Sequence, residues 1–269
     1  MRPISSLLLG ITALSLPTAA LTQAVALSSD TTVTLSGTTF RDHDALVDDK
    51  AGGNALLSLG TLPDATDVTA YHLFSNGDQL FSLDTGADLG SGVIVSSGDV
   101  VRFDGTNHSI EFNASAEGIP DGVGVDATTI HSSGDTLLSF DTTVDLGGGV
   151  TARDDDLVRF DGLSAYTIFF DGSAQSVPES LDLDGADYRA SDGHLFLSFD
   201  GSGSLGGVNF DDEDILEFDP SGPTWSLFYD GSAEHAELGA ADVIAVPEPV
   251  ASLLLLAGSA FLGVCLRRR

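Results

Sequence analysis

The sequence predicts an all-β fold built from repeats of about 57 residues. Three observations support this prediction. The phrases "SNGDQLFSLDT", "SSGDTLLSFDT" and "SDGHLFLSFDG" begin at residues 75, 132 and 191, so they lie 57 and 59 residues apart. Each repeat holds four short apolar runs in the same order, rich in β-branched, aromatic and leucine residues. Gly, Asp, Asn, Ser or Pro bounds every run, as expected for strands joined by turns.

The second repeat illustrates the predicted strands. They lie at 125–132, 135–141, 156–162 and 166–172. "SSG" joins the first pair and "LSA" joins the second pair, and both connections are short enough for hairpins of antiparallel strands. The connection between the second and third strands, "TTVDLGGGVTARDD" at 142–155, is rich in glycine and aspartate. It is predicted to be an exposed loop.

Four antiparallel strands, repeated, are typical of the blades of a β-propeller. One such sheet is not stable alone, so several must pack face to face in a ring. The predicted blades are 67–114, 125–172 and 183–230, plus a blade divided between 27–60 and 240–246. The N-terminal and C-terminal strands would then close a small four-bladed ring. The same repeats could also build an elongated stack of β-sheet units or a pair of β-sandwiches.

The N-terminal residues 1–26 have the pattern of a secretory signal peptide. Arg2 supplies the positive charge, the apolar run "ISSLLLGITALSLP" follows, and small residues end in "AVA". The predicted cleavage point follows Ala26, with Ala20 as the alternative. The repeat domain is therefore expected to occupy 27–246.

The C-terminal end carries an apolar segment followed by positive charge. Residues 250–266 form 17 consecutive uncharged positions, which predicts a transmembrane helix. Arg267, Arg268 and Arg269 follow at once. Because arginines favour the cytoplasmic side, this pattern predicts that the repeat domain lies outside the cytoplasm.

Pro247, Glu248 and Pro249 come directly before the apolar segment. This tripeptide, the apolar helix and the basic tail together resemble the PEP-CTERM sorting signal of Gram-negative bacteria. The resemblance covers only 247–269. It implies export through the inner membrane, transient anchoring by the helix, and processing by an exosortase whose own cysteine, not Cys265, performs the reaction. An uncleaved single-span anchor is the alternative.

The charge between the two predicted signals is strongly negative. Six of the 10 basic residues and 40 of the 41 acidic residues lie within 27–246, so this part carries about −34. Such a surface repels nucleic acid and anionic membranes. This part also has no cysteine, which excludes disulfides and thiol catalysis.

Acidic residues cluster where the long connection meets the third strand. Carboxylates in loops are ligands that Ca²⁺ prefers, so calcium is the candidate cofactor, with a solvent-exposed acidic surface as the alternative. The candidate ligands are Asp154, Asp155, Asp156, Asp211, Asp212, Glu213 and Asp214.

No specific catalytic motif is present, and the protein is expected not to be an enzyme. His72 and His131 fall in equivalent first strands, so a propeller hydrolase with a metal in the central channel is the alternative. Trp225 follows a turn and is the candidate for stacking on a sugar.

The predicted function is that of an exported protein at the cell surface or in the extracellular matrix. Its expected partners are the exosortase and the inner membrane during transit. Extracellular polysaccharide or surface proteins are the candidate partners afterwards. Binding of a glycan, a protein or calcium is a hypothesis that follows from the compartment and the charge.

Overall fold

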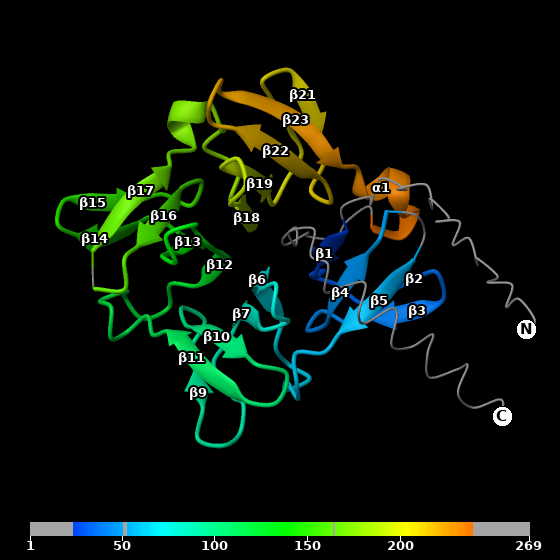
Figure 1. Cartoon of the computed structure of the whole chain (residues 1–269), viewed down its shortest axis with the longest axis vertical. Helices are drawn as coiled ribbons and strands as arrows, with labels where there is room; N and C mark the ends of the chain where they lie inside the picture. Colours follow the sequence, from blue (N-terminus) through cyan, green and yellow to red (C-terminus); the bar gives the residue numbers. More distant parts are fainter. Residues whose placement is uncertain (1–23, 51–52, 164, 239–269) are drawn as a thin grey trace, which may run out of the picture.

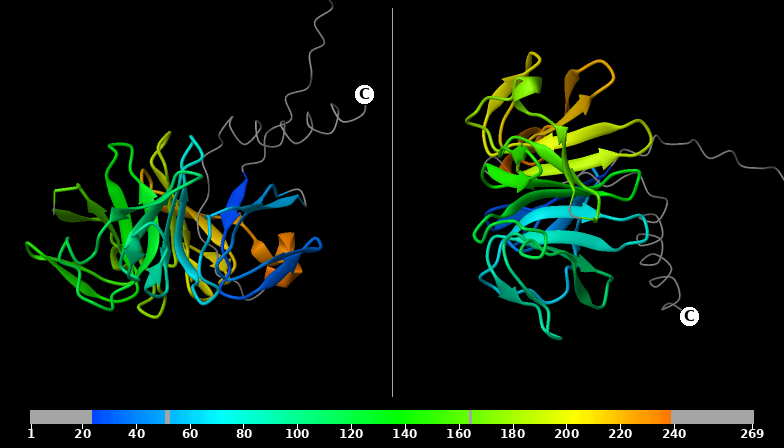
Figure 2. Two further views of the ribbon diagram at one scale, coloured as in Figure 1. Left: turned by 90° about the horizontal axis from the view of Figure 1, so that it is seen from below. Right: turned by 90° about the vertical axis from the view of Figure 1, so that its left-hand side faces the viewer.

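The computed structural model describes residues 24–50, 53–163 and 165–238. Four antiparallel sheets stand around a common centre and form a four-bladed β-propeller (Figure 1). Seen from the side, the ring is a flattened disc whose thickness is crossed by the strands (Figure 2). The all-β fold and the four-bladed ring predicted from the sequence are therefore confirmed. The stack and sandwich alternatives are wrong.

Three blades hold four strands each, in the same order from the centre to the rim (Figure 1). Blade one consists of β6 (Val68–Leu73), β7 (Gln79–Leu83), β10 (Val100–Phe103) and β11 (His108–Phe112). Blade two consists of β12 (Val125–Ile130), β13 (Thr136–Phe140), β16 (Leu157–Phe160) and β17 (Tyr166–Phe170). Blade three consists of β18 (Gly185–Arg189), β19 (His194–Ser198), β22 (Ile215–Asp219) and β23 (Thr224–Tyr229).

The fourth blade contains β1 (Val25–Leu27), β4 (Ala45–Asp48) and β5 (Asn54–Leu57), paired in that order. Val25 and Ala26 are fully buried and pair with Asp48 and Val47. The first strand of this domain thus begins two residues before the predicted boundary at residue 27. The innermost strand predicted at 240–246 lies outside the described residues and stays a prediction.

The sorting signal predicted at 247–269 also lies outside the described residues. That range includes Pro247, Glu248 and Pro249 as well as the terminal arginines. In the part of the chain that the structure describes, no helix is long and apolar enough to cross a membrane.

The connection between the second and third strands is a β-hairpin in every blade, and not the predicted loop. In blade two, Val144 and Ala152 are buried and pair with each other, while Gly148 and Gly149 turn the chain at positive φ. The glycines that indicated a loop therefore form the tip of an additional hairpin. The four hairpins are β2 (Val33–Leu35) with β3 (Thr38–Phe40), β8 (Ala87–Asp88) with β9 (Ile94–Val95), β14 (Val144–Gly147) with β15 (Val150–Ala152), and β20 (Gly203–Leu205) with β21 (Val208–Phe210).

A β-bulge occurs at the same place in the outermost strand of blades one, two and three. In blade one, Val100 pairs with Phe112 but Val101 pairs with Ile110, so Glu111 is the additional residue. The same shift leaves Phe169 additional in β17 and Phe228 additional in β23. A bulged residue has no partner in the ladder, so its side chain takes a new direction.

Short helical turns follow the outermost strands of blades two and three. They are η1 (Ser173–Gln175), α1 (Gly231–Glu234) and η2 (Ala236–Leu238). Asp171 and Asp230 begin these turns, and the Oδ1 atom of each accepts a hydrogen bond at 2.9 Å from the backbone N–H three residues ahead. Asn113 makes the same 2.9 Å hydrogen bond in blade one. An uncharged amide therefore serves as well as a carboxylate at this position.

The hydrophobic core is divided among the four junctions between blades. Phe112 meets Phe160 edge to face across the junction of blades one and two, with ring centroids 5.2 Å apart. Phe170 meets Phe218 in the same way across the next junction, at 5.3 Å. Because both faces of a blade need a neighbour, this packing requires a ring.

A buried aspartate precedes the third strand of each repeat and ties two turns together. The Oδ2 atom of Asp156 accepts from the backbone N–H of Arg153, and its Oδ1 atom accepts from that of Gly172, both at 3.0 Å. Asp99 and Asp214 make the equivalent pair of hydrogen bonds in blades one and three. This aspartate explains why the acidic phrase recurs in the sequence.

A second buried carboxylate joins blades three and four. Asp48, which is fully buried in β4, accepts hydrogen bonds at 2.8 Å from the Tyr229 hydroxyl and from Nε2 of His235. Lys50 donates to the carbonyl of Phe228 at 2.8 Å and lies over the ring of the same residue. We call these contacts the Asp48 clasp. They connect residues that are about 180 positions apart in the chain.

We predict that Asp156→Ala lowers the free energy of unfolding by about 2 kcal/mol, because two buried backbone N–H groups lose a charged acceptor. Urea unfolding followed by circular dichroism measures this change. Asp161→Ala is the control, because Asp161 also accepts backbone hydrogen bonds but is exposed. Equal losses in both variants would contradict the structural role of the buried carboxylate.

Candidate functional site: a groove between blades two and three

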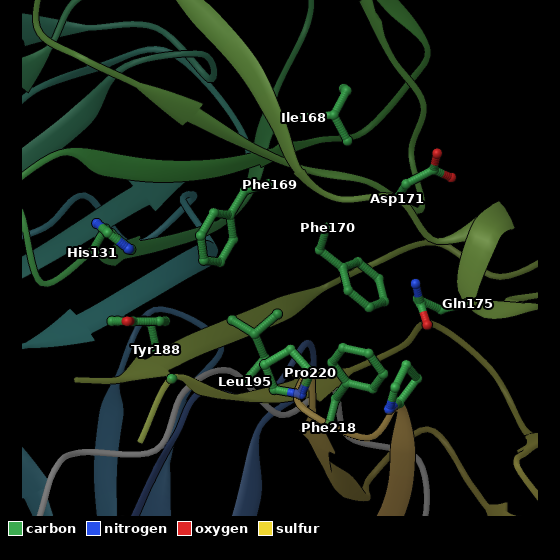
Figure 3. Close-up of a pocket in the computed structure, with 12 residues that line it drawn as sticks. His131, Ile168, Phe169, Phe170, Asp171, Gln175, Tyr188, Leu195, Phe218 and Pro220 are labelled. Carbon is green, nitrogen blue, oxygen red and sulfur yellow. The ribbon is translucent and has the colours of Figure 1, made fainter. Parts of the chain in front are cut away.

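A groove with a volume of about 650 Å³ lies between blades two and three. One wall comes from β17 and the turn that follows β12, and the other from β18, β19 and β22 (Figure 3). Phe169 and Phe170 of the first wall lie opposite Tyr188, Leu195 and Phe218 of the second wall. The lining is therefore mainly aromatic and aliphatic, as in most binding pockets for small ligands.

Three half-buried rings gather at one end of the groove. The ring centroids of His131 and Tyr188 are 4.8 Å apart, and Phe169 meets both rings edge to face at 5.3 and 5.8 Å. The hydroxyl of Tyr188 lies 3.5 Å from that of Ser132. We call His131, Phe169 and Tyr188 the aromatic cluster. It is partly open to solvent, so a flat ligand can stack on it.

The local backbone explains how this cluster forms. Phe169 is the bulged residue of β17 and is released from the ladder, so its side chain reaches the groove. His131 directly follows β12, and Tyr188 lies in β18 opposite Leu195. Equivalent positions at the junction of blades one and two hold Phe74, Glu111 and Ile130. The two junctions thus share the same backbone arrangement, and the aromatic cluster forms only where the side chains at these positions are His131, Phe169 and Tyr188.

Polar groups lie at the other end of the groove, where Phe170 separates Asp171 and Gln175 from the aromatic cluster (Figure 3). Hydrogen bonds from the Ala174 backbone and the Ser173 hydroxyl lower the pKa of Asp171, so it is ionised at neutral pH. Burial, and to a lesser extent Arg159, lowers the pKa of His131. At neutral pH the groove lining therefore carries a negative charge and no positive charge.

A polar network on the propeller axis joins the innermost strands of three blades. Thr129 donates to Oδ1 of Asp187 at 2.8 Å, and Nδ1 of His72 lies 3.0 Å from the same oxygen. The three residues occupy equivalent positions of β6, β12 and β18. The Thr129 hydroxyl also lies 3.2 Å from Nδ1 of His72, so the hydroxyl, the imidazole and the carboxylate form one hydrogen-bonded group.

The two histidines proposed to hold a channel metal do not share a site. His72 belongs to the axial network, whereas His131 belongs to the aromatic cluster. Within residues 24–50, 53–163 and 165–238, no group of three or more His, Cys, Asp or Glu side chains is arranged to hold a metal ion.

The candidate calcium ligands of blade two have separate surroundings. Asp156 makes the structural hydrogen bonds described above. Asp155 is fully buried, and its Oδ1 atom lies 3.1 Å from Nε of Arg153. Burial raises the pKa of Asp155, and the charge of Asp156 raises it further. Asp154 is half-buried, and its backbone carbonyl accepts a hydrogen bond from the backbone N–H of Leu183.

The acids of blade three follow the same plan. Glu213 and Asp214 are buried, and burial raises the pKa of both. Asp212 is half-buried and Asp211 is exposed. The acidic phrase is thus neither uniformly exposed nor gathered around one point, and calcium binding by it stays a prediction.

Two equivalent carboxylate groups lie around Asp67 and Asp182. Burial, and next the charge of Asp42, raises the pKa of Asp67 to about 7. Burial, and next the charge of Asp154, raises the pKa of Asp182 to about 7. The backbone N–H groups of Asp67 and Asp182 donate to Asp84 and Asp200 at 2.7 and 2.8 Å. The proximity of these acids was not predicted, because Asp67 and Asp42, and likewise Asp182 and Asp154, are far apart in the sequence and meet only at a junction between blades.

Trp225 packs at the junction of blades two and three. Its ring centroid lies 4.8 Å from that of Phe218 and 6.1 Å from that of Phe170, and it is half-buried. It does not line the groove. Stacking of Trp225 on a sugar stays a prediction, but the aromatic cluster is better placed for that role.

The groove was not predicted from the sequence because its residues come from two repeats. From the sequence, His131 was considered only as a metal ligand. The sequence signal that could have indicated the groove is the difference between Glu111 in blade one and Phe169 at the equivalent position of blade two.

A scan of family models and a search of curated proteins gave no match to the chain. Solved structures show a distant likeness. Virginiamycin B lyase from Staphylococcus aureus is 13% identical, with a TM-score of 0.33, over 77% of this chain and 74% of that chain. A luciferin-regenerating enzyme is 11% identical, with a TM-score of 0.34, over 83% and 64% of the two chains. A protein from Bacteroides caccae is 12% identical, with a TM-score of 0.31, over 76% and 56%.

The expectation that this protein is not an enzyme is corrected by these comparisons. Two of the similar structures are named as enzymes, so a fold of this kind and the lack of a sequence motif do not exclude catalysis. At 11 to 13% identity, the likeness assigns no reaction to this chain.

We predict that replacing Asp67 and Asp182 by Asn changes the pH dependence of stability. Their pKa rises from 3.8 in the unfolded chain to about 7, so the protonated forms stabilise the fold below 3.8 and this contribution is lost as the pH rises through 7. The double variant should be more stable than the unchanged protein above pH 7, on the order of 1 kcal/mol per site after solvent screening.

Thermal unfolding across this pH range measures the difference between the two proteins. Asp88→Asn, in an exposed hairpin, is the control for a change in net charge. The interpretation would be wrong if the double variant lost the same stability at every pH.

Proposed function

We propose that the protein is exported and binds a glycan outside the cytoplasm, with the groove between blades two and three as the binding site. The observation that supports glycan binding most directly is the groove of about 650 Å³ with its half-buried aromatic cluster. Aromatic faces are suited to the apolar faces of sugar rings, and Asp171 and Gln175 offer hydrogen-bonding groups at the other end. The predicted sorting signal supports a location at the cell surface or in the extracellular matrix.

We predict that Tyr188→Ile weakens binding of the hexamer of N-acetylglucosamine or of cellohexaose about tenfold, because it removes a stacking face. The chain itself carries isoleucine, Ile130, at the equivalent position of blade two, so the variant should fold. Isothermal titration calorimetry measures the affinity.

Ile168→Ala and Ile110→Ala provide a matched pair for this experiment. Both isoleucines are 37% exposed at equivalent positions of an outermost strand, but only Ile168 lines the groove. Binding should weaken only in Ile168→Ala. If the unchanged protein binds neither these oligosaccharides nor a charged hexasaccharide, the proposed function is wrong.

The export part of the proposal makes its own prediction about processing. Cleavage after Ala26 would remove two of the three residues of β1, whereas cleavage after Ala20 would leave β1 intact. We therefore expect the mature chain to begin at Leu21. Mass spectrometry of the N-terminal peptide of protein recovered from outside the cytoplasm measures this. A chain that begins at Leu27 would contradict it.

A further inference from the structure

We propose that the groove selects a sugar unit with a positive charge, namely an amino sugar whose ammonium group lies against Phe169 and Tyr188. This inference rests on the proposed function, because it names the class of glycan that the groove takes. It follows from a comparison of the three bulged positions, from the charges around the groove, and from the carboxylate at its polar end.

The bulged residue of two other blades already contacts a cation from the chain itself. In blade one, Arg102 Nη1 lies 3.6 Å from Oε2 of the bulged Glu111. At the edge of blade three, Nζ of Lys50 lies 4.1 Å from the ring centroid of the bulged Phe228. Phe169 is the bulged residue of blade two. Among the residues that the structure describes, no cation lies over its ring or over that of Tyr188.

The bulged position therefore occurs in three blades, and in two of them its side chain contacts a cation of the chain. In blade two the position opens into a groove large enough for a ligand. An aromatic face attracts a cation through its quadrupole, and this attraction is strongest where water is excluded. An ammonium group supplied by a ligand would complete in blade two the contact that the chain completes for itself at Glu111 and Phe228.

The charges around the groove exclude an acidic sugar. The guanidinium groups that act on the groove lining are already paired. Arg159, whose charge acts on His131, contacts Asp135, and Arg153, whose charge acts on Asp171, contacts Asp155 and Glu179. Arg189, which follows Tyr188, contacts Asp192 and Glu217. A carboxylate on the ligand would thus lose water without gaining a positive partner. The domain as a whole also carries about −34, which favours the approach of cations and opposes that of anions.

Asp171 supplies a negative charge at the polar end of the groove. It is exposed and ionised, and only its Oδ1 atom is used by the turn, through hydrogen bonds from Ser173 and Ala174. A glycan chain that extends from the aromatic cluster towards Asp171 can place a second ammonium group near this carboxylate. The groove thus offers two places for positive charge on one chain.

The experiment compares two oligosaccharides that differ in charge. The full chain is titrated with the hexamer of β-1,4-linked glucosamine and with its N-acetylated counterpart, at a mildly acidic pH that keeps the amine protonated. A galacturonate hexamer represents acidic sugars. We expect the glucosamine hexamer to bind about tenfold more tightly than the N-acetylated hexamer, and the galacturonate hexamer not to bind.

Matched variants separate the groove from the overall charge. Asp171→Asn should reduce the preference for glucosamine about two- to fivefold. It should fold, because Asn113 makes the same hydrogen bonds at this position of blade one. Asp230→Asn is the control: it removes one negative charge at the same position of blade three, outside the groove. It should leave the preference unchanged.

Each outcome decides between the proposals. If the N-acetylated or galacturonate hexamer binds as tightly as the glucosamine hexamer, the charge selection is wrong while glycan binding stands. If no hexamer binds, the proposed function itself fails. Equal effects of Asp171→Asn and Asp230→Asn would mean that the overall charge, and not the groove, produces the preference, which would overturn the assignment of the site.

Discussion

The ring depends on the Asp48 clasp, because the junction of blades three and four joins parts that are far apart in the chain. In a repeat fold each unit contacts mainly its neighbours, so a single open junction would expose two hydrophobic faces. Asp48 is fully buried and bonded to Tyr229 and His235, and the apolar side chains of β1, β2 and η2 surround the same junction. A charge in this position is tolerated only with such complete pairing.

The strong acidity of the chain has a structural explanation for a part of its residues. The aspartate before each third strand accepts hydrogen bonds from backbone N–H groups of two turns, and this recurs in three blades. Recurrence of an acidic phrase therefore reflects the construction of the blade. Other acids are placed where they are partly buried and close to one another, as at Asp67 and Asp182, and burial first and the neighbouring charge second raise their pKa to about 7. The same set of residue types thus stabilises one part of the blade and destabilises another.

The sequence predicted much of the fold and little of the site. The spacing of the phrases at 75, 132 and 191 was sufficient for the blades, because repeats of strands and turns depend on local patterns. The additional hairpins were missed because the glycines of 147–149 are as compatible with a loop as with a tight turn. The groove combines Phe169 with Tyr188 of the next repeat, and which repeats touch at which register depends on packing between blades. Trp225 was selected because it follows a turn, but its neighbours Phe218 and Phe170 give it a role in packing.

The β-bulge of the outermost strands has a consequence for how such a protein can diversify. The bulged residue takes no part in the ladder, so its identity is not fixed by strand pairing, while the hydrogen bonds around it hold the backbone constant. Glu111, Phe169 and Phe228 are three solutions at one position: an ion pair, an open aromatic face and a covered aromatic face. A single substitution at any of these positions can exchange one surface chemistry for another. A small ring of repeats can in this way acquire a new specificity at one junction without new architecture.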